Sequence, residues 1–488
     1  MRYQTLTELR RQLNNKTISA VELTAETLKM LAEDPHNAVL STCDALANRQ
    51  AVLADRALLE PAILEPAMAD GKQNALLGLP IVYKDNFNVT DYPTTCASNI
   101  LKNYRSVYDA TVVDLMQQQG SITIGKANMD EFAMGSTNEN SAFGPVNNPF
   151  NPAHCTGGSS GGSAAVVAAG LVPVAFGSDT GGSVRQPAAF CGVVGLKPTY
   201  GRLSRFGIVA FGSSFDQPGI FAHTAEDVAL TLTATARHDP KDSTSVDIAC
   251  GDYIDQLNQP LSGKKVGVVK SLFERVRGKT IQARYEAALA IYAKLGVQLV
   301  EIDLPDPELS VAAYYILSSC ECSSNLSRFD GVRYGYRSKN ADDLQALYTN
   351  SRSEGFGAEV KRRILLGTFA LSAGYIDAYY VKAQKMRRAI LNQFKQRFEQ
   401  VDAILLPTSL STAPKLGQDF DYNDDMCTIT ANLAGLPAIS HSVGLADGLP
   451  VGLQIIGQHF AEDCLLNMTQ QFQSVSDFHL NHPQTNSS

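Results

Sequence analysis

The sequence predicts an α/β fold in which helices cover a mixed or largely parallel β-sheet. Two observations carry this prediction. Apolar segments of strand length alternate with segments of helical periodicity, and the glycine-rich stretch 157–212 is interleaved with apolar runs that must be buried. No segment repeats with a period of 20–50 residues, which argues against a solenoid. The 488 residues suffice for a large buried core.

The N-terminal region is expected to begin with two helices. Residues 5–13 place apolar side chains at helical spacing. Ser19 can cap a second helix over residues 20–33, with Glu22 three positions later as its capping-box partner. A polar connector is expected near residues 66–75.

Strands and helices then alternate along the chain. A helix over 109–120 stops at Gly120, and a strand over 121–126 follows it. The other expected strands are 78–83, 265–269 and 296–302. The other expected helices are 161–170, 225–235 and 279–294.

We divide the chain into an N-terminal helical segment packed on the core (1–75), a main domain (76–475) and a polar C-terminal tail (476–488). The main domain includes a helical, basic insertion at about 308–400. Within it, residues 352–397 hold ten Lys or Arg against three acids, a net charge of +7 that leaves −15 on the rest of the chain. Such a cluster can hold a carboxylate or steer a polyanion, or it can be a solvated helix face.

Composition excludes several classes of protein. The longest apolar stretch, Ala164 to Phe176, has 13 residues, whereas a bilayer span needs about 20. The N-terminus lacks the apolar run of a signal peptide, so a soluble, cytoplasmic protein without a membrane partner is expected. The nine cysteines are scattered, which argues against a disulfide scaffold or a metal site. A net charge of −8 argues against tight binding of nucleic acid by this chain alone.

Two serine-containing strings are the strongest candidates for chemistry. GGSSGGS at 157–163 contains Ser159, and DTGGSVRQPAAF at 179–190 contains Ser183. Small residues flank both serines, so that a substrate can approach the backbone closely. The backbone amides of four residues could converge on one oxygen and stabilise the oxyanion of acyl transfer: Thr180, Gly181, Gly182 and Ser183.

A nucleophilic serine needs a base. None of the eight histidines lies in a comparably constrained string, and the G-x-S-x-G motif is absent around Ser183. Lys84 follows the apolar segment 78–83, where burial would lower its pKa and make the neutral amine available. The alternative is a Lys84 paired with Asp85, and spacing alone does not choose between the two.

The serine strings resemble the amidase signature family of serine hydrolases. Four further segments are similar to one subgroup of that family, the A subunits of tRNA-dependent amidotransferases: 127–149, 323–339, 351–380 and 431–440. The resemblance covers about residues 5–475. It implies one large domain with a twisted mixed sheet and helices on both faces.

The resemblance implies a Ser-cis-Ser-Lys catalytic set. Ser183 corresponds to the nucleophile, Ser159 to the serine that relays the proton, and Lys84 to the base. Their oxyanion hole corresponds to the backbone of residues 180–183.

The resemblance further implies hydrolysis of glutamine to glutamate and ammonia. This chain would form a heterotrimer with partner B and C subunits. The B subunit would use ATP and Mg to convert mischarged Glu-tRNA or Asp-tRNA with that ammonia. This chain would bind no cofactor and no metal itself, and tRNA would be bound mainly by the B subunit. One alternative is a stand-alone amidase for small amides. The other is a non-catalytic scaffold, and the intact Lys84, Ser159 and Ser183 argue against this second alternative.

Glutamine recognition requires a cation for the α-carboxylate and an anion for the α-ammonium. The resemblance implies Arg363 for the first role and Asp425 for the second, with Tyr314 lining the pocket. Because the string around Asp425 departs from the family pattern, Asp424 stays open as the alternative anion. Cys155-Thr156 stands before the first serine string where Val-Pro is commoner in the family.

Overall fold

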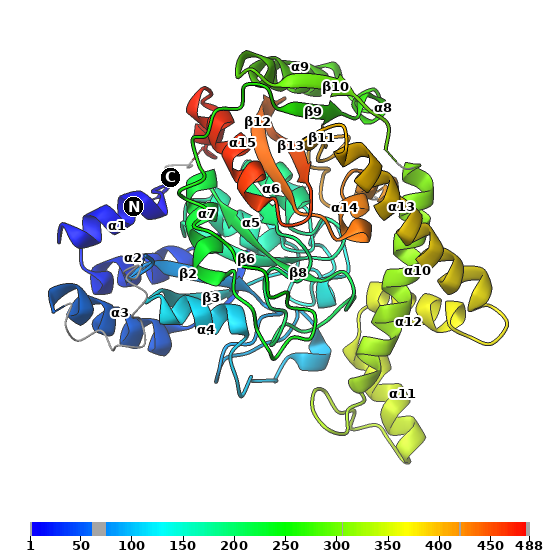
Figure 1. The fold of residues 1–488 in the computed structure, drawn as a ribbon. Coiled ribbons are helices and arrows are strands. Elements are labelled where there is room, and N and C mark those ends of the chain that lie inside the picture. Colours follow the sequence, from blue (N-terminus) through cyan, green and yellow to red (C-terminus); the bar gives the residue numbers. More distant parts are fainter. Residues whose placement is uncertain (1, 61–74, 305, 419–420, 485–488) are drawn as a thin grey trace.

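The protein is described from a computed structural model, which covers residues 2–60, 75–304, 306–418 and 421–484. Helices surround a twisted central sheet, and a group of helices extends from one side of it (Figure 1). The predicted connector near 66–75 lies, apart from its last residue, outside the described residues. The two terminal segments meet, since the rings of Tyr3 and His482 stack with centroids 4.0 Å apart.

The described residues form a main sheet of 11 strands in the order β1-β3-β2-β6-β8-β7-β12-β13-β11-β9-β10. Its strands are β1 (Val39–Thr42), β2 (Pro80–Lys84), β3 (Ile122–Ala127), β6 (Val174–Asp179), β7 (Val194–Lys197), β8 (Gln217–Ala222), β9 (Lys265–Val268), β10 (Gln298–Glu301), β11 (Ala403–Pro407), β12 (Ala438–Ala446) and β13 (Leu449–Gly457). Strands β4 (Asn147–Asn148) and β5 (Asn151–Cys155) form a separate pair.

The sheet is mixed. Strands β3, β2 and β6 run parallel at one side, and β11, β9 and β10 run parallel at the other. The remaining neighbours pair antiparallel. The prediction of a mixed α/β sheet is confirmed, and its largely parallel variant is excluded.

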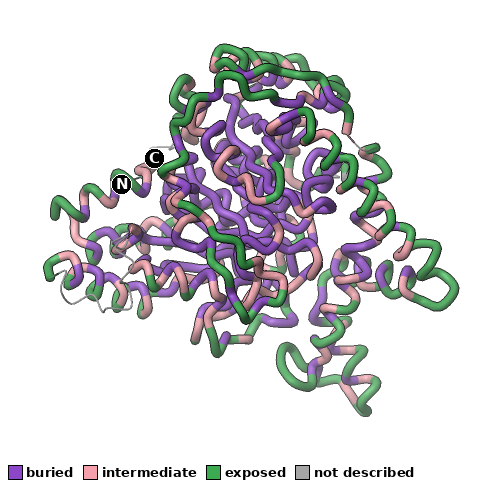
Figure 2. The backbone as a smooth tube through the Cα atoms, viewed as in Figure 1, coloured by how far each residue is buried: buried purple, intermediate pink, exposed green. Residues whose placement is uncertain are grey.

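Helices cover both faces of the sheet. As a result, every residue of the strands β2, β6, β7 and β8 is buried. Figure 2 shows this buried centre beneath an exposed outer layer of helices. The α-helices are α1 (Leu6–Asn14), α2 (Ala20–Ala32), α3 (Asp44–Leu59), α4 (Thr111–Gln118), α5 (Gly161–Ala168), α6 (Arg185–Cys191), α7 (Ala225–Thr235), α8 (Lys270–Phe273), α9 (Lys279–Lys294), α10 (Pro307–Asn325), α11 (Leu344–Gly355), α12 (Ala358–Ala370), α13 (Lys382–Phe398), α14 (Ile429–Ala434) and α15 (Glu462–Ser474).

Local sequence signals match the N-terminal elements well. Ser19 and Glu22 form the expected capping box at the start of α2, and Thr5 forms a second one with Glu8 at α1. Strand β1 was not expected: it lies within the segment predicted to be helical and pairs antiparallel with β3 at the edge of the sheet. In the part of the chain that is described, no helix is both long and apolar enough to cross a bilayer.

Candidate active site

Lys84 ends strand β2, which lies between β3 and β6 in the sheet, and is fully buried. Its Nζ lies 2.7 Å from Ser159 Oγ, 2.9 Å from Ser160 Oγ and 3.0 Å from Ser178 Oγ. The lysine therefore points at the first serine string, as a base for these hydroxyls must. Ser160 and Ser178 were not singled out from the sequence, although Ser160 stands in the same glycine-rich string.

Asp85 does not pair with Lys84. Because side chains alternate along a strand, Asp85 faces the other way and meets Lys126 of β3, with 3.0 Å between Lys126 Nζ and Asp85 Oδ1. Both of these side chains are buried. The alternative of a structural Lys84–Asp85 pair is thereby excluded.

Burial lowers the pKa of Lys84 to about 7, because a charged ammonium is disfavoured away from water. The negative charges of Asp130, Asp179 and Asp216 act in the opposite direction and limit the fall. The neutral amine is consequently accessible near neutral pH, which a base requires.

The first serine string turns tightly from β5 into helix α5. The peptide bond between Gly158 and Ser159 is cis. The carbonyl of Ser159 accepts the backbone N–H of Asp130 at 3.1 Å. The backbone N–H of Ser160 donates to the carbonyl of Ser183 at 3.3 Å, so the two serine strings lie side by side.

The second serine string connects β6 to helix α6. The Asp179 carboxylate, at the end of β6, accepts the backbone N–H groups of Gly182 (2.9 Å) and Val184 (3.1 Å). Arg185 holds the same carboxylate through Nε and Nη2, each at 3.0 Å. Burial alone would raise the pKa of Asp179, but the Arg185 guanidinium outweighs it and holds that pKa below its usual range. A buried ion pair thus fixes the loop that presents Ser183.

This loop corrects one expectation about the oxyanion hole. The Gly182 N–H, expected to face an oxyanion, donates to Asp179 Oδ1 at 2.9 Å, and Gly182 itself adopts φ +126°. Among the described residues, the amides of Gly181 and Ser183 have no hydrogen-bond acceptor and are available. Thr180 is held by its side chain, whose Oγ1 donates to Asp216 Oδ1 at 2.6 Å.

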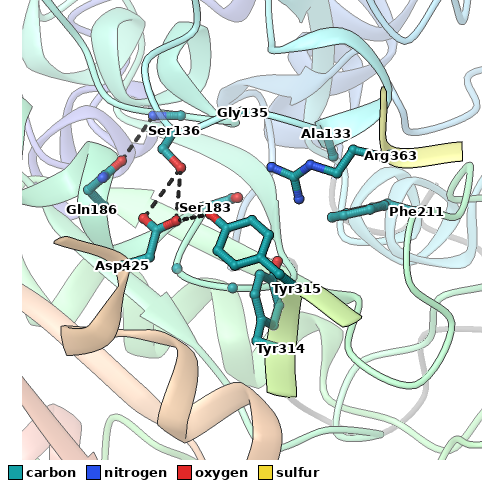
Figure 3. Close-up of a pocket in the computed structure, with 13 residues that line it drawn as sticks. Ala133, Gly135, Ser136, Ser183, Gln186, Phe211, Tyr314, Tyr315, Arg363 and Asp425 are labelled. Carbon is teal, nitrogen blue, oxygen red and sulfur yellow. Dashed lines mark hydrogen bonds between the residues drawn. The ribbon is translucent and has the colours of Figure 1, made fainter. Parts of the chain in front are cut away.

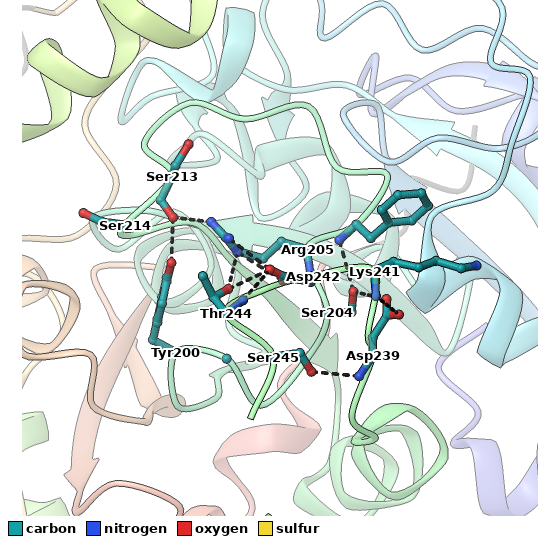
Figure 4. A network of polar contacts seen from close by, with 12 residues as sticks. Tyr200, Ser204, Arg205, Ser213, Ser214, Asp239, Lys241, Asp242, Thr244 and Ser245 are labelled. Carbon is teal, nitrogen blue, oxygen red and sulfur yellow. Dashed lines mark hydrogen bonds and ion pairs between the residues drawn. The ribbon is translucent and has the colours of Figure 1, made fainter. Parts of the chain in front are cut away.

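A polar network fixes the loop behind this turn (Figure 4). Arg205 Nη2 lies 3.1 Å from Asp242 Oδ1, and Arg205 Nη1 donates to the carbonyl of Ser213. Tyr200 Oη donates to the same carbonyl at 2.7 Å. The network holds in place the loop whose Phe211 lines the pocket beside Ser183.

A small pocket opens above Ser183 (Figure 3). It brings together Ser183, Arg363, Asp425 and Tyr314, four residues that sequence analysis selected from distant parts of the chain. Convergent polar groups in one pocket are typical of a small-molecule site. The lining residues are Ala133, Gly135, Ser136, Gly158, Gly181, Gly182, Ser183, Gln186, Phe211, Tyr314, Tyr315, Arg363 and Asp425.

Arg363 comes from helix α12 and is only 3% exposed. Its Nε donates to Glu359 Oε1 at 2.6 Å, one helical turn earlier, which leaves Nη1 and Nη2 without a hydrogen-bond partner among the described residues. The guanidinium lies 4.8 Å from the ring centroid of Tyr315 and points into the pocket (Figure 3). The two free nitrogens are suited to a carboxylate.

The structure distinguishes the two candidate anions. Asp425 lines the pocket and accepts hydrogen bonds from Tyr315 Oη at 2.7 Å and from Ser136 Oγ at 3.3 Å. Asp424 lies outside the lining and pairs with Arg277. Burial raises the pKa of Asp425 to about 6, against the opposing effects of Tyr315 and Arg363.

Tyr314 closes the pocket beside the loop of the second serine string. Its ring occupies the place where a side chain on Gly181 would stand, since a Cβ there would meet the Tyr314 ring and Oη closer than van der Waals contact allows. Tyr315 and Ser136, which hold Asp425, were missed by sequence analysis. Tyr315 adjoins Tyr314 in the chain, but no local signal indicates that both neighbours on α10 face the pocket.

Comparison with known proteins places the chain in a family. The family model described as Amidase matches residues 22–466, so the chain belongs to the amidase family. This confirms the resemblance stated from the two serine strings.

Relatives within the family narrow the comparison. The chain is 53% identical to the Moraxella catarrhalis protein named as the A subunit of glutamyl-tRNA(Gln) amidotransferase, over 87% of this chain and 88% of the relative. A solved structure of the protein with that name from Thermotoga maritima matches with a TM-score of 0.77 and 39% identity, over 97% of this chain and 95% of the other. The peptide amidase of Stenotrophomonas maltophilia matches with a TM-score of 0.83 and 27% identity, over 100% of this chain and 99% of the other.

Proposed function

We propose that this protein is the glutaminase subunit of a tRNA-dependent amidotransferase. The observation that carries the proposal is the pocket above Ser183, in which the Arg363 guanidinium, with Nη1 and Nη2 unpaired among the described residues, and the Asp425 carboxylate are held on separate elements. Glutamine presents the matching charges on its α-carbon and an amide at the end of its side chain. The relatives named as amidotransferase A subunits over nearly the whole chain support the same assignment.

Catalysis would begin with attack of Ser183 Oγ on the side-chain carbonyl carbon of glutamine. Neutral Lys84 takes the Ser183 proton through Ser159 Oγ, which lies 2.7 Å from Lys84 Nζ. The same route returns the proton to the amide nitrogen, so that the C–N bond breaks and ammonia leaves. Water, deprotonated by the same lysine, then releases glutamate from the acyl-enzyme.

The developing oxyanion would be stabilised by backbone amides. We assign this role to Gly181 and Ser183, with Thr180 as the third donor of the group, and exclude Gly182 because its N–H is held by Asp179. Asp179 therefore acts as a positioning residue for the turn.

Substrate recognition would use both charges of the pocket. Arg363 binds the α-carboxylate through Nη1 and Nη2, and Asp425 accepts the α-ammonium. An ammonium beside Asp425 favours the ionised carboxylate and offsets the effect of burial on its pKa. Tyr314 forms the wall between the substrate and the serine loop.

The remaining steps belong to partners. In this proposal a B subunit binds ATP, Mg and the mischarged Glu-tRNA(Gln) or Asp-tRNA(Asn), and a C subunit completes a cytoplasmic heterotrimer. This chain supplies the ammonia and holds no cofactor of its own.

The test is glutamate release from glutamine, measured for the chain alone and with its B and C partners, mischarged tRNA and ATP. Stimulation by the partners and formation of Gln-tRNA or Asn-tRNA are expected. Ser183→Ala should abolish both. Vigorous hydrolysis of many amides by the lone chain, without any stimulation, would establish the stand-alone amidase instead.

Arg363→Ala tests the recognition of glutamine. Loss of charge-assisted hydrogen bonds worth about 1.5–3 kcal/mol should raise the KM for glutamine about 10–100-fold. Hydrolysis of an uncharged amide should change little. The matched control is Arg362→Ala, the adjacent arginine of the same helix, whose side chain is 51% exposed and lies outside the pocket. An equal loss with both amides would contradict the assigned role.

A further inference from the structure

Helices α12 and α13 form a hairpin that projects from the body of the molecule (Figures 1 and 2). Between them, residues 371–382 include a π-helical turn, Asp377–Val381, and none of these residues is buried. π-Helical turns are rare and occur frequently at functional sites. The turn that joins the two helices is therefore not anchored in the core, whereas α12 and α13 themselves pack on α10.

Large apolar side chains nevertheless gather on this hairpin. We define the hairpin surface by six of them: Leu365, Leu366, Phe369, Tyr375, Ile376 and Tyr379. Leu365 is 70% exposed and Phe369 is 47% exposed. The rings of Phe369 and Tyr375 lie 4.5 Å apart, and Tyr379 completes the aromatic cluster at 6.0 Å from Phe369. An exposed apolar cluster of this kind marks an interaction site.

The segment that carries the hairpin surface is rich in basic residues. Residues 358–388 hold seven basic and two acidic side chains, in a chain whose net charge is −8. Two of the arginines, Arg363 and Arg387, are drawn inward, to the pocket and to Ser214 respectively. By helix spacing, Lys361 and Arg362 lie one turn before Leu365 and Leu366, and Lys382 lies three positions after Tyr379. These cations adjoin the apolar cluster, and Arg362 also pairs with Glu359.

We propose that the hairpin surface docks a second protein subunit, one that presents apolar side chains bordered by carboxylates. The inference rests on the proposed function, in which ammonia formed here is used by a partner. Leu366 follows the pocket residue Arg363 by three positions on α12, so the two side chains are neighbours on the surface of that helix. A partner on this surface would lie beside the pocket that makes its substrate.

A protein fits this surface better than tRNA does. Phosphates would pair with the surrounding lysines and arginines, and bases could stack on the aromatic rings. Neither interaction covers Leu365, Leu366 or Ile376, whose aliphatic side chains gain free energy only when water is removed from them. Aromatic and aliphatic anchors inside a charged border are typical of protein interfaces.

The test uses the full chain with Leu365→Asp and Phe369→Asp combined, mixed with the B and C subunits. The Kd for the subunits should rise at least about 30-fold, as for loss of hot-spot residues at an interface. Glutamate release by the isolated chain and its circular dichroism spectrum should not change. The matched control is Leu53→Asp on α3, another leucine of high exposure (62%), which should leave the Kd unchanged.

Reversing the charge of lysines near the hairpin surface provides a second, independent test. Lys361→Glu with Lys382→Glu should slow association and reduce its dependence on salt, because both exposed side chains adjoin the hairpin surface by helix spacing. An increase in association rate would overturn the stated chemistry of the partner.

Three results would overturn the inference, and they are distinguishable. An unchanged Kd for the double aspartate variant, with normal tRNA amidation, would exclude the hairpin surface as the docking site and leave the proposed function intact. Loss of tRNA binding with an intact heterotrimer would assign the surface to tRNA. Failure of the wild-type chain to associate with the B and C subunits would overturn the inference and the proposed function together.

Discussion

The rate of amide hydrolysis is expected to rise between pH 6 and pH 8 and then to level off. The reason is that Lys84 acts as a neutral amine in the proposed mechanism, and burial lowers its pKa to about 7. Since the folded-state pKa is lowered, the active form is lost as the pH falls through this value.

The size of the effect follows from the pKa. With a value near 7, about a tenth of the Lys84 amines are neutral at pH 6 and about nine tenths at pH 8. kcat/KM should therefore increase about tenfold over this interval and change little above it. A lysine with its ordinary pKa of about 10.4 would instead give about a 100-fold increase over the same two units and no plateau below pH 9.

Other groups titrate in the same interval and must be separated from Lys84. Burial lowers the pKa of Lys197 to about 7 and raises that of Asp425 to about 6. An uncharged amide as substrate removes the contribution of Asp425, whose proposed role is to bind an ammonium. Lys197→Met removes the second lysine, whose Nζ donates to the carbonyl of Pro198.

The assay is kcat/KM for an uncharged amide from pH 5.5 to 9.5, with the wild-type chain and Lys197→Met in parallel. Both profiles should rise about tenfold with a midpoint near pH 7. A profile that is flat down to pH 5.5, or a midpoint that disappears in Lys197→Met, would refute the role given to Lys84.

Three further predictions concern residues around the site. Gly181→Ala should lower kcat/KM about 100-fold, because the new Cβ would displace Tyr314 or the serine loop. Adding Tyr314→Ala should restore kcat in part. An unchanged kcat/KM in Gly181→Ala would contradict the close packing of Tyr314 on Gly181. Lys126→Met should destabilise the fold by about 3–5 kcal/mol in urea titrations, since it leaves the buried Asp85 carboxylate without its cation. A second change, Asp85→Asn, should recover part of the loss, because it removes the charge and keeps an acceptor for the Thr95 N–H. Asp424→Asn should change the KM for glutamine by less than about twofold, because its carboxylate lies outside the pocket; a large rise would reopen the choice of anion.

Local signals in the sequence predicted many of the helices and strands. Capping at Ser19, helix termination at Gly120 and the apolar segment before Lys84 depend on interactions within a few residues, and each occurs as expected. Strand β1 was missed because its four residues are only half-buried at a sheet edge, so they show no strong alternation. Its pairing with β3, about 80 residues away, identifies it as a strand.

The candidate site divides in the same way. The sequence by itself determined the serine strings, the presence of a lysine at the end of a buried strand, and the membership in the amidase family that these residues imply. It left open whether Lys84 faces Asp85, and whether Asp424 or Asp425 meets the substrate.

Tertiary structure decided these points. The sheet places Lys126 beside Asp85 and turns Lys84 toward Ser159. The helices α10 and α12 and the helical turn Tyr422–Cys427 bring Tyr315, Arg363 and Asp425, respectively, around one pocket. It also commits the Gly182 N–H to Asp179. The physical reason is that the direction of a side chain, the partner of a buried charge and the acceptor of an amide depend on residues far away in the chain, whose positions only the packed fold defines.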